Sequence, residues 1–401
     1  MKVVTPPPLY LTVIPLPYHD DDAFWGRDMG LLALGMRENG VDARVVAFGD
    51  REKYANHLPL ILGNLSDLEN PEWWRKLNPY GVIMNTWSAP RYDKIRKAVL
   101  SVTPRVIEKL DTDGVRSPRT WLSKYIYATY GSYLDSGNKL KKRLAAILAL
   151  SRTIVIQYFP GLLDKKMAIT MSQIPILAAE SPIAVARIQR FLRCFISTPP
   201  IVTCIPHPVA VEYMRADSSI EREKRIVCVG RWNAYQKNFP MLKKVLKEFL
   251  SVHDDWTADI IGTMPKGFNF QKETASITER IRIHGHISRR DIAEMYQKSR
   301  IFLMPSRYES FNIAAAEALC CGCSIVGSGD IASVSFFTDQ NSGTSVCRQT
   351  RTHFLDALNS EVSAWEGGER NPKLISERWI SIVGSTSVGK KVLTCFETII
   401  P

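Results

Sequence analysis

The chain has 401 residues, of which 45% are hydrophobic and 23% charged, and its formal net charge at pH 7 is +12. This length favours two α/β domains, and the composition excludes a collagen-like or largely disordered chain. The excess of basic residues predicts attraction to anionic partners such as phosphates, nucleotides and acidic lipid surfaces.

The first two hundred residues alternate short apolar runs with amphipathic stretches, which is the pattern of a parallel sheet with crossover helices. Ala23–Asn39 has helical apolar spacing and is followed by Gly40, a residue typical of helix C-caps. Strands are predicted at Leu9–Leu16, Ala43–Phe48, Gly81–Asn85, Arg105–Leu110, Met167–Ser172 and Ile201–Ile205. We therefore expect a Rossmann-like domain over residues 1–206.

A basic segment lies within this domain. Residues 115–200 include thirteen basic residues and three acidic ones. Lys139–Leu144 adjoins the apolar run Ala145–Leu150, so this stretch is either a solvated helix face or a peripheral contact with an anionic membrane. The eight cysteines lack the spacing of a disulfide framework, and no secretory signal or membrane-spanning run is found. We expect a cytoplasmic protein, either free or peripheral at the inner face of a membrane.

A second alternation begins after a linker at Ile205–Val209, so we place the domain boundary near residue 207. Its strands are predicted at Arg225–Val229, Thr257–Ile261, Ile281–His284 and Ile301–Met304, with a helix at Met241–Val252. Residues 207–375 are expected to form a second Rossmann-like domain. Residues 376–401 are expected to form a C-terminal helix that packs back toward the N-terminal domain.

The run from Met304 to Leu319 predicts a ligand site at the carboxyl edge of the second sheet. A strand ends at Met304, and an Ala-rich helix begins near Phe311 with Ser310 or Glu309 in the capping position. A helix N-terminus at this edge suits a diphosphate. Glu317 returns to nearly the same helical face as Ser310, so two carboxylates could hold the hydroxyls of a sugar and a ribose. A capping glutamate and an ordinary surface glutamate are the alternative.

A polar loop, Gly230–Asn238, follows the strand predicted at Arg225–Val229. It brings a glycine and two cations to the same edge. Arg231 offers a planar fork for phosphate oxygens and Lys237 a compact charge, so together they could neutralise a diphosphate leaving group. Two solvated surface cations are the alternative for this loop taken alone.

Taken together, these elements resemble family 4 of the retaining glycosyltransferases, also called glycosyl transferases group 1. The resemblance covers about residues 205–330. Its ordered elements are Gly230-Arg231…Lys237-Asn238, His284-Gly285-His286-Ile287, the helix with Ile292, Tyr296 and Ser299, Glu309…Glu317, and Ala318–Val326. It implies the GT-B fold, in which two Rossmann-like α/β domains enclose a donor cleft. It also implies transfer of a sugar from a UDP- or GDP-sugar to a glycan or lipid-linked acceptor, in the synthesis of cell-surface polysaccharide or another glycoconjugate.

The same resemblance implies roles for the donor residues. Arg231 and Lys237, beside Gly230, would hold the diphosphate and stabilise its departure, and Glu309 would contact the transferred sugar; these three are the catalytic candidates. Glu317 would bind the ribose, and His284 and His286 belong to the base-contacting turn. The N–H groups of Phe311 and Asn312, after Ser310, would cap the phosphates. No cofactor and no metal are expected, because cationic side chains and helix N-termini neutralise the diphosphate.

The sequence departs from the family pattern at several positions. The common EGFG element reads Glu309-Ser310-Phe311-Asn312, and the proline before the following strand is replaced by Ser324. The N-terminal half lacks a clear glycine pair in its first loop and the histidine that ends a later strand. His19, Asp111 and Asp113 are therefore the candidates for the acceptor side, with turn or capping chemistry as their alternative.

Other interpretations were weighed against this one. Asp20–Asp22 resembles a metal cluster but is more typical of a helix N-cap, and Cys320, Cys321 and Cys323 fit a buried turn better than a zinc site. A protein that binds nucleotide sugars without turnover, and a nucleotide-sugar epimerase, are the alternative functions. Nucleic-acid binding is not expected, because no aromatic stacking motif or helix-turn-helix accompanies the positive charge.

Overall fold

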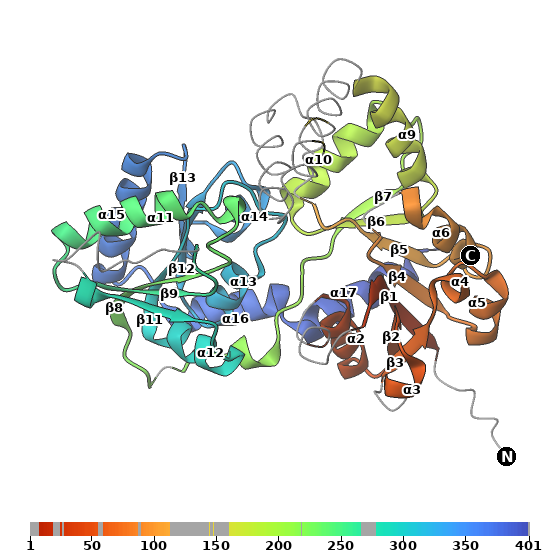
Figure 1. The fold of residues 1–401 in the computed structure, drawn as a ribbon, viewed down its shortest axis with the longest axis horizontal. Helices are drawn as coiled ribbons and strands as arrows, with labels where there is room; N and C mark the ends of the chain where they lie inside the picture. The colour runs from red at the N-terminus through yellow and green to blue at the C-terminus, as the bar shows by residue number, and fades with distance from the viewer. Residues whose placement is uncertain are drawn as a thin grey trace. The chain divides into compact units, whose positions relative to one another are not determined.

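The computed structural model describes residues 8–18, 25, 28–54, 59–86, 90–112, 144, 147, 160–217, 219–265 and 278–399. The chain divides into two compact units. The first comprises Met1–Gly114, Lys165–Val211 and Ile380–Pro401, and the second comprises Val115–Asp164 and Glu212–Trp379. Each unit has its own parallel sheet with flanking helices, as Figure 1 shows. The expected α/β class and the two Rossmann-like sheets of the GT-B fold are confirmed.

The sheet of the first unit has seven strands in the order β3-β2-β1-β4-β5-β6-β7, and its described pairs are parallel. The strands are β1 Leu9–Pro17, β2 Asp42–Phe48, β3 Leu60–Gly63, β4 Gly81–Met84, β5 Val106–Lys109, β6 Ile176–Ala179 and β7 Ile201–Cys204. The helices are α2 Asp28–Glu38, α3 Arg51–Tyr54, α4 Leu65–Leu68, α5 Pro71–Leu77, η1 Pro90–Tyr92, α6 Asp93–Leu100, α9 Pro160–Ser172, α10 Pro182–Arg193 and α17 Ser385–Glu397.

Both faces of this sheet are buried, which explains why its strands read as short apolar runs. Leu11 and Val13 of β1 belong to the hydrophobic cluster on one face. Tyr10 of the same strand belongs to the cluster on the other face, where α2 and α17 pack. Successive residues of a strand point to opposite faces, so β1 contributes to both clusters.

The strand predicted at Met167–Ser172 is wrong, because these residues end helix α9. Ala168 and Met171, three residues apart, are both buried in the same cluster, as the helical repeat requires. Pro175 follows the helix and cannot continue it, and the strand of this region, β6, begins at Ile176. Strands β3 and β6 were not predicted; with four residues each, they are too short to show a clear period.

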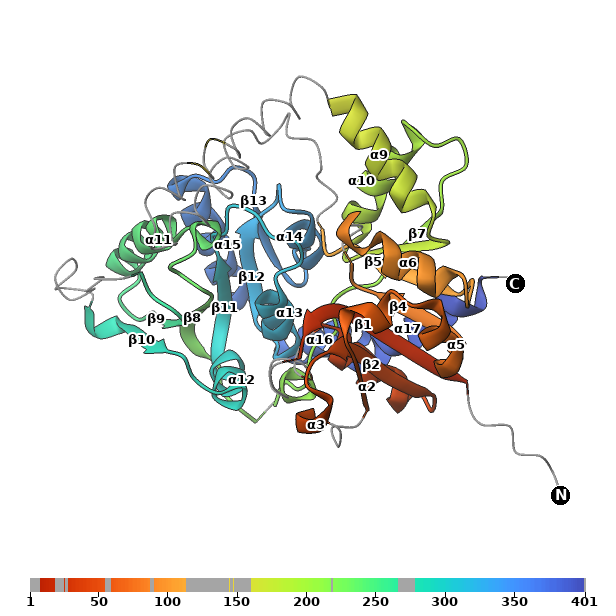
Figure 2. The same cartoon turned by 45° about the vertical axis from the view of Figure 1, so that its right-hand side comes forward.

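The second unit has a six-stranded sheet in the order β10-β9-β8-β11-β12-β13, with parallel described pairs. The strands are β8 Glu223–Val229, β9 Thr257–Ile261, β10 Ile281–Gly285, β11 Ser299–Met304, β12 Ser324–Ser328 and β13 Gly343–Val346. The helices are η3 Val211–Tyr213, η4 Tyr235–Lys237, α11 Phe239–Val252, η6 Thr278–Arg280, α12 Arg289–Lys298, α13 Ile313–Cys320, α14 Ala332–Phe337 and α15 Arg351–Glu366. Figure 2 shows β8, β11 and β12 side by side, with α13 beside them.

Cys320, Cys321 and Cys323 are fully buried at the turn between α13 and β12, as expected for small apolar residues. Burial raises the pKa of all three thiols, so each stays protonated at neutral pH. Arg222 fills the space beside this turn and donates to the carbonyls of Tyr296 and Ser299 at 3.0 and 2.7 Å. These cysteines therefore pack the turn.

No helix among the described residues has both the length and the apolar character needed to span a membrane. The basic stretch Lys139–Arg143 and most of the apolar run after it lie outside the described residues. Leu144 and Ile147 are described and exposed.

The final residues form two helices where a single helix was predicted. Helix α16, Pro372–Val383, begins in the second unit and ends in the first, and α17 follows Gly384. Helix α17 crosses α2 at two glycines. A Cβ added to Gly35 would lie 2.0 Å from the carbonyl oxygen of Ser385, and one added to Gly389 would lie 2.3 Å from the carbonyl carbon of Gly35. Only glycine at both positions permits this close approach of two backbones.

Replacing Gly389 by alanine is therefore expected to destabilise the first unit, although alanine favours helices more than glycine does. The added methyl group has rigid backbone as its neighbour, so the two helices must move apart. We expect a loss of about 1–3 kcal/mol in the free energy of unfolding, measured by urea denaturation. Lys390→Ala, an exposed position one residue further along α17, is the matched control. Equal stability of the two variants would contradict the close crossing.

Candidate active site

The residues predicted for donor binding gather at the carboxyl edge of the second sheet. The order of this sheet reverses between β8 and β11, and ligands of open α/β sheets bind at such a point. Lys237 comes from the loop after β8, and Glu309 from the loop after β11. Side chains 72 residues apart in sequence are thus brought into contact.

Glu309 is held on both carboxylate oxygens and has an exposed fraction of 6%. Its Oε1 accepts a hydrogen bond from Lys237 Nζ at 2.7 Å, and its Oε2 accepts one from Gln236 Nε2 at 2.8 Å. Asn312 Nδ2 is a further donor, 3.3 Å from Oε1. Two residues predicted as separate ligand contacts therefore form one ion pair, which fixes the carboxylate before any ligand arrives.

The loop before α13 differs from the prediction in its cap. We expected the helix to begin near Phe311 with Ser310 or Glu309 as its cap, but α13 begins at Ile313 and Asn312 is its N-cap. The Asn312 side chain accepts a hydrogen bond from the backbone N–H of Ala315 at 3.1 Å. Phe311 is fully buried against Phe337, with ring centroids 5.0 Å apart, so its side chain anchors the loop.

This cap also explains why the altered EGFG element can keep its shape. Asn312 has φ 66°, in the left-handed region that glycine adopts freely and asparagine tolerates best among the other residues. Ser310, which stands at the first glycine of the element, is not among the residues with positive φ. A side chain at position 310 therefore costs no backbone strain.

A second set of contacts supports the loop that carries Lys237. Arg307 donates from Nη1 to the carbonyl of Tyr235 at 2.7 Å, and its guanidinium lies 4.0 Å from the centre of the Tyr235 ring. The backbone N–H of Arg307 donates to the carbonyl of Gln236 at 2.8 Å. Arg231, by contrast, is exposed, and no ion pair joins it to another described residue. Its guanidinium thus has its donors available at this edge.

Glycine is required where the loops after β8 and β9 meet. Gly262 has φ 110°, and a Cβ there would lie 2.1 Å from the carbonyl oxygen of Gly230. Gly230 itself donates its N–H to the carbonyl of Ile261 at 3.1 Å, and the Lys237 side chain runs past its α-carbon. The predicted glycine thus lies beside the lysine that follows it in the motif.

The two histidines of the predicted base-contacting turn have different surroundings. His284 Nε2 lies 2.6 Å from Oδ1 of the buried Asp259, whose Oδ2 pairs with Arg225 at 3.1 Å. His286 is exposed, and its Nε2 lies 2.7 Å from Thr263 Oγ1, in the loop after β9. His284 is thus engaged with the interior, whereas His286 lies on the surface. Contact of either with a base stays a prediction.

Glu317 lies on α13 and is partly buried. Burial and, after it, the negative charge of Glu317 raise the pKa of the Tyr213 and Tyr296 hydroxyls. The carboxylate therefore lies near two phenols that stay neutral. Its contact with a ribose stays a prediction.

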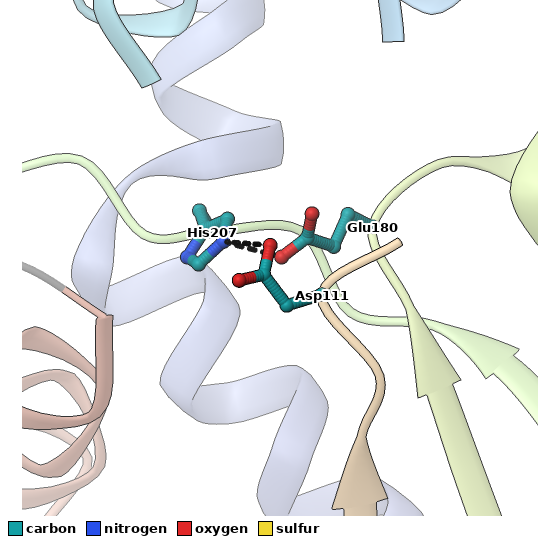
Figure 3. Close-up of side chains that lie close together, drawn as sticks. All are labelled: Asp111, Glu180 and His207. Carbon is teal, nitrogen blue, oxygen red and sulfur yellow. Dashed lines mark ion pairs between the residues drawn. The ribbon is translucent and has the colours of Figure 1, made fainter. Parts of the chain in front are cut away.

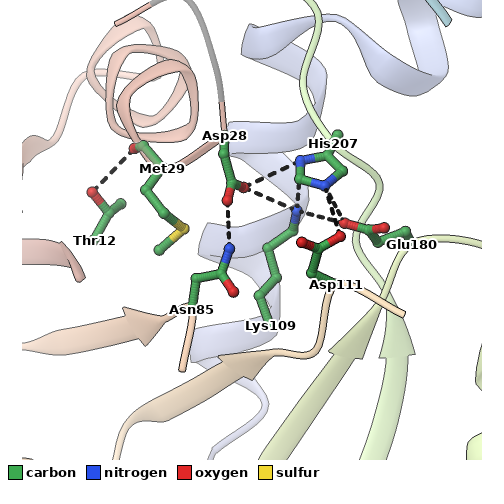
Figure 4. Close-up of polar contacts among 8 residues, drawn as sticks. All are labelled: Thr12, Asp28, Met29, Asn85, Lys109, Asp111, Glu180 and His207. Carbon is green, nitrogen blue, oxygen red and sulfur yellow. Dashed lines mark hydrogen bonds and ion pairs between the residues drawn. The ribbon is translucent and has the colours of Figure 1, made fainter. Parts of the chain in front are cut away.

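A cluster of charged side chains occupies the carboxyl edge of the first sheet. We call it the N-terminal charge cluster: Asp28, Lys109, Asp111, Glu180 and His207, shown with Asn85 in Figure 4. Lys109 ends β5, and the others follow β1, β5, β6 and β7. Of the residues predicted for the acceptor side, Asp111 belongs to this cluster, whereas His19 and Asp113 lie outside the described residues.

The two cations of the cluster lie among its three carboxylates. Lys109 Nζ is 3.3 Å from Asp28 Oδ1 and 3.4 Å from Glu180 Oε1. His207 Nδ1 is 3.2 Å from Asp28 Oδ1, while its Nε2 contacts Glu180 and lies 3.6 Å from Asp111 Oδ1, as Figure 3 shows for the last two. Lys109 and Glu180 are fully buried and His207 is nearly so. Buried charges of opposite sign therefore compensate one another here.

This arrangement shifts the pKa values of its members. Burial by itself would lower the pKa of His207, but the carboxylates of Glu180, Asp28 and Asp111 outweigh burial and raise it well above the ordinary value. Burial would raise the pKa of Asp111, but His207 and Lys109 lower it to about 2. The pKa of Asp28 is lowered for the same reasons. At neutral pH the imidazole is charged and the carboxylates are ionised.

Asp111, Glu180 and His207 offer ligand atoms within 4.8 Å of one another, which is close enough for a metal ion. Their surroundings fit a metal poorly. Lys109 Nζ lies 3.4 Å from Glu180 Oε1 and 3.3 Å from His207 Nδ1, so an ammonium already supplies positive charge. A protonated imidazole also has no lone pair for a metal.

Sequence reasoning missed most of this cluster. His207 was assigned to the linker, and Asp28, Asn85, Lys109 and Glu180 were not singled out. One signal could have identified them, because each lies at or just after the end of a short buried strand or at the start of the first crossover helix. A polar residue at that position in a parallel sheet faces the ligand-binding edge.

The raised pKa of His207 predicts how its contribution to stability depends on pH. A raised folded-state pKa stabilises fully below the unfolded value of about 6.5, and this contribution is lost as pH rises through the folded-state value. The difference in unfolding free energy between wild type and His207→Gln should therefore shrink as pH rises above about 6.5, in urea denaturation from pH 5 to pH 9. His253→Gln, in the second unit, serves as the control. A difference that grows with pH would contradict the charged imidazole.

Comparison with known proteins identifies the family. The model of the family described as glycosyl transferases group 1 matches residues 211–367. In human phosphatidylinositol N-acetylglucosaminyltransferase, one of the subunits is 26% identical over 130 residues, which are 32% of this chain and 27% of that protein. The chain therefore aligns with about a quarter of this relative's length.

Solved structures of similar fold cover almost the whole chain. A glycosyltransferase from Rickettsia africae superposes with a TM-score of 0.65 at 13% identity, covering 98% of each chain. HepE of Anabaena, solved in complex with UDP and glucose, superposes with a TM-score of 0.59 at 10% identity, covering 97% of this chain and 99% of HepE. The family match, the two parallel sheets and this likeness of fold agree. The chain belongs to the glycosyl transferases group 1 family, the retaining glycosyltransferases of the GT-B fold.

Proposed function

We propose that the protein transfers a sugar, with retention of configuration, from a UDP- or GDP-sugar to a glycan or lipid-linked acceptor. The observation that carries this proposal is the Lys237–Glu309 pair at the point where the second sheet reverses its order. An anchored carboxylate, a lysine and the exposed Arg231 at one sheet edge match a sugar, a diphosphate and a charged leaving group.

The donor residues would divide the work as follows. Arg231 and Lys237 bind the diphosphate and stabilise the negative charge that develops as the bond to the sugar breaks. Lys237 has three N–H donors, so it can contact a phosphate oxygen and still keep its bond to Glu309. Glu309 accepts hydrogen bonds from sugar hydroxyls, Glu317 from the ribose, and the backbone at Ser310–Asn312 caps the phosphates. Residues 207–375 would thus form the donor domain.

The acceptor is proposed to bind the first unit, residues 1–206. Because His207 is charged at neutral pH, it is unsuited to accept the proton of an acceptor hydroxyl. We propose that this proton passes to the departing diphosphate oxygen as the hydroxyl oxygen bonds to the anomeric carbon on the same face. No side-chain nucleophile and no metal is required.

The donor and the cellular setting are narrower parts of the proposal. HepE was solved with UDP and glucose, which makes UDP-sugars the first donors to test. The positive charge between residues 115 and 200 supports action at the inner face of a membrane, in the synthesis of cell-surface polysaccharide or another glycoconjugate. A nucleotide-sugar binder without turnover and a nucleotide-sugar epimerase are the competing functions.

Nucleotide binding tests the donor site without knowledge of the acceptor. Calorimetry with UDP, GDP and ADP should give selective binding of one nucleotide. Affinity should fall about tenfold or more in Glu317→Ala and in Arg231→Ala/Lys237→Ala, because each loses charge-assisted hydrogen bonds. Lys298→Ala is the control, since this exposed lysine ends α12 at the opposite edge of β11. If wild type binds none of the three nucleotides, the donor site is wrongly placed.

A second experiment separates transfer from binding. Glu309→Gln preserves shape but removes the charge opposite Lys237, so we expect a fall of about a hundredfold or more in kcat for sugar transfer, with nucleotide affinity changed only a few-fold. Product and donor are followed by mass spectrometry. Conversion of the donor sugar to its epimer with no acceptor present would favour the epimerase, and neither product in wild type would favour the binder.

A further inference from the structure

We propose that the N-terminal charge cluster recognises the hydroxyl groups of an uncharged sugar or polyol and discriminates against anionic ligands. The inference rests on the proposed function only in taking this ligand to be the acceptor. It is carried by the charges of the cluster, by two buried oxygens that lack a hydrogen-bond donor, and by the residues that remain accessible.

The cluster has a negative net charge. Three carboxylates, Asp28, Asp111 and Glu180, face two cations, Lys109 and His207, which leaves one negative charge. A neutral imidazole would make the cluster more negative still, so the sign does not depend on the protonation of His207. A phosphate or carboxylate placed here meets repulsion of several kcal/mol in a region of low dielectric.

Two oxygens of the cluster have no donor among the described residues. Glu180 Oε2 and Asn85 Oδ1 are both without a hydrogen bond, although their side chains are 0% and 1% exposed. Each neighbouring polar atom is used: Glu180 Oε1 contacts Lys109 and His207, and Asn85 Nδ2 donates to Asp28. Figure 4 shows both residues at the same cluster. Buried acceptors of this kind favour a ligand that donates hydrogen bonds.

The cations of the cluster are poorly placed to bind an anion. Lys109 is fully buried between Asp28 and Glu180, and His207 has carboxylates at both ring nitrogens. The accessible part is acidic, since the Asp111 and Asp28 side chains are 30% and 17% exposed. A ligand therefore meets carboxylate oxygens first, which accept hydrogen bonds from vicinal hydroxyls.

Matched neutral and anionic sugars test this directly. Saturation-transfer NMR on the full chain would use the methyl glycosides of glucose, galactose, mannose and N-acetylglucosamine, with myo-inositol, against the corresponding methyl uronosides and inositol phosphate. We expect at least one neutral ligand to bind about tenfold or more tightly than its anionic counterpart. Equal or tighter binding of the anionic ligand, or binding of no neutral ligand, would overturn the inference.

Two isosteric variants locate the effect. Glu180→Gln should weaken the neutral ligand about tenfold, and Asp111→Asn, at a more exposed position, should reduce the discrimination against the anionic ligand about tenfold by removing a charge. Thermal unfolding verifies that each variant folds, and Asp111→Asn alone decides the test if Glu180→Gln does not fold. Glu72→Gln, an exposed carboxylate of α5, is the matched control. Discrimination unchanged in Asp111→Asn would overturn the inference.

Nucleotide binding distinguishes this inference from the proposed function. A chain that binds a nucleotide selectively but prefers the anionic sugars retains its proposed function and loses the acceptor class. A chain that binds neutral sugars at the cluster but no nucleotide retains the inference and loses the proposed function.

Discussion

Parallel pairing of the strands is the constraint on which both candidate sites depend. When every strand of a sheet runs the same way, the residue after each strand arrives at the same edge. In the second unit this brings Lys237 and Glu309 together, and in the first it brings Asn85, Asp111, Glu180 and His207 together. A single antiparallel strand among them would place its following residue at the opposite edge.

The two edges have opposite electrostatic character. At the edge of the second sheet the exposed Arg231 leaves positive charge accessible, whereas at the edge of the first sheet the accessible side chains are Asp28 and Asp111 and the cations are buried behind them. A diphosphate needs cations that it can reach, while hydroxyl groups are bound well by carboxylates. The same sheet geometry can therefore serve an anionic ligand in one unit and an uncharged one in the other. The difference is in which charges remain accessible.

The altered donor motif illustrates how backbone conformation limits substitution. Asparagine can replace a glycine at position 312 because its side chain tolerates φ 66° and caps α13. At position 310 no positive φ is needed, so serine fits. Gly262 has no such freedom, because a Cβ there would lie 2.1 Å from the carbonyl oxygen of Gly230. The departures thus occur where the backbone permits a side chain.

The sequence by itself determined the α/β class, most strands and the order of the donor elements, because hydrophobic period and motif spacing are local properties of the chain. It could not separate helix from strand at Met167–Ser172, where a short apolar run fits both. Only the tertiary structure decided that Lys237 pairs with Glu309 and that His207, in an apparent linker, joins Asp28, Lys109 and Glu180. Such contacts join residues distant in sequence, and they depend on strand order, which no local pattern records.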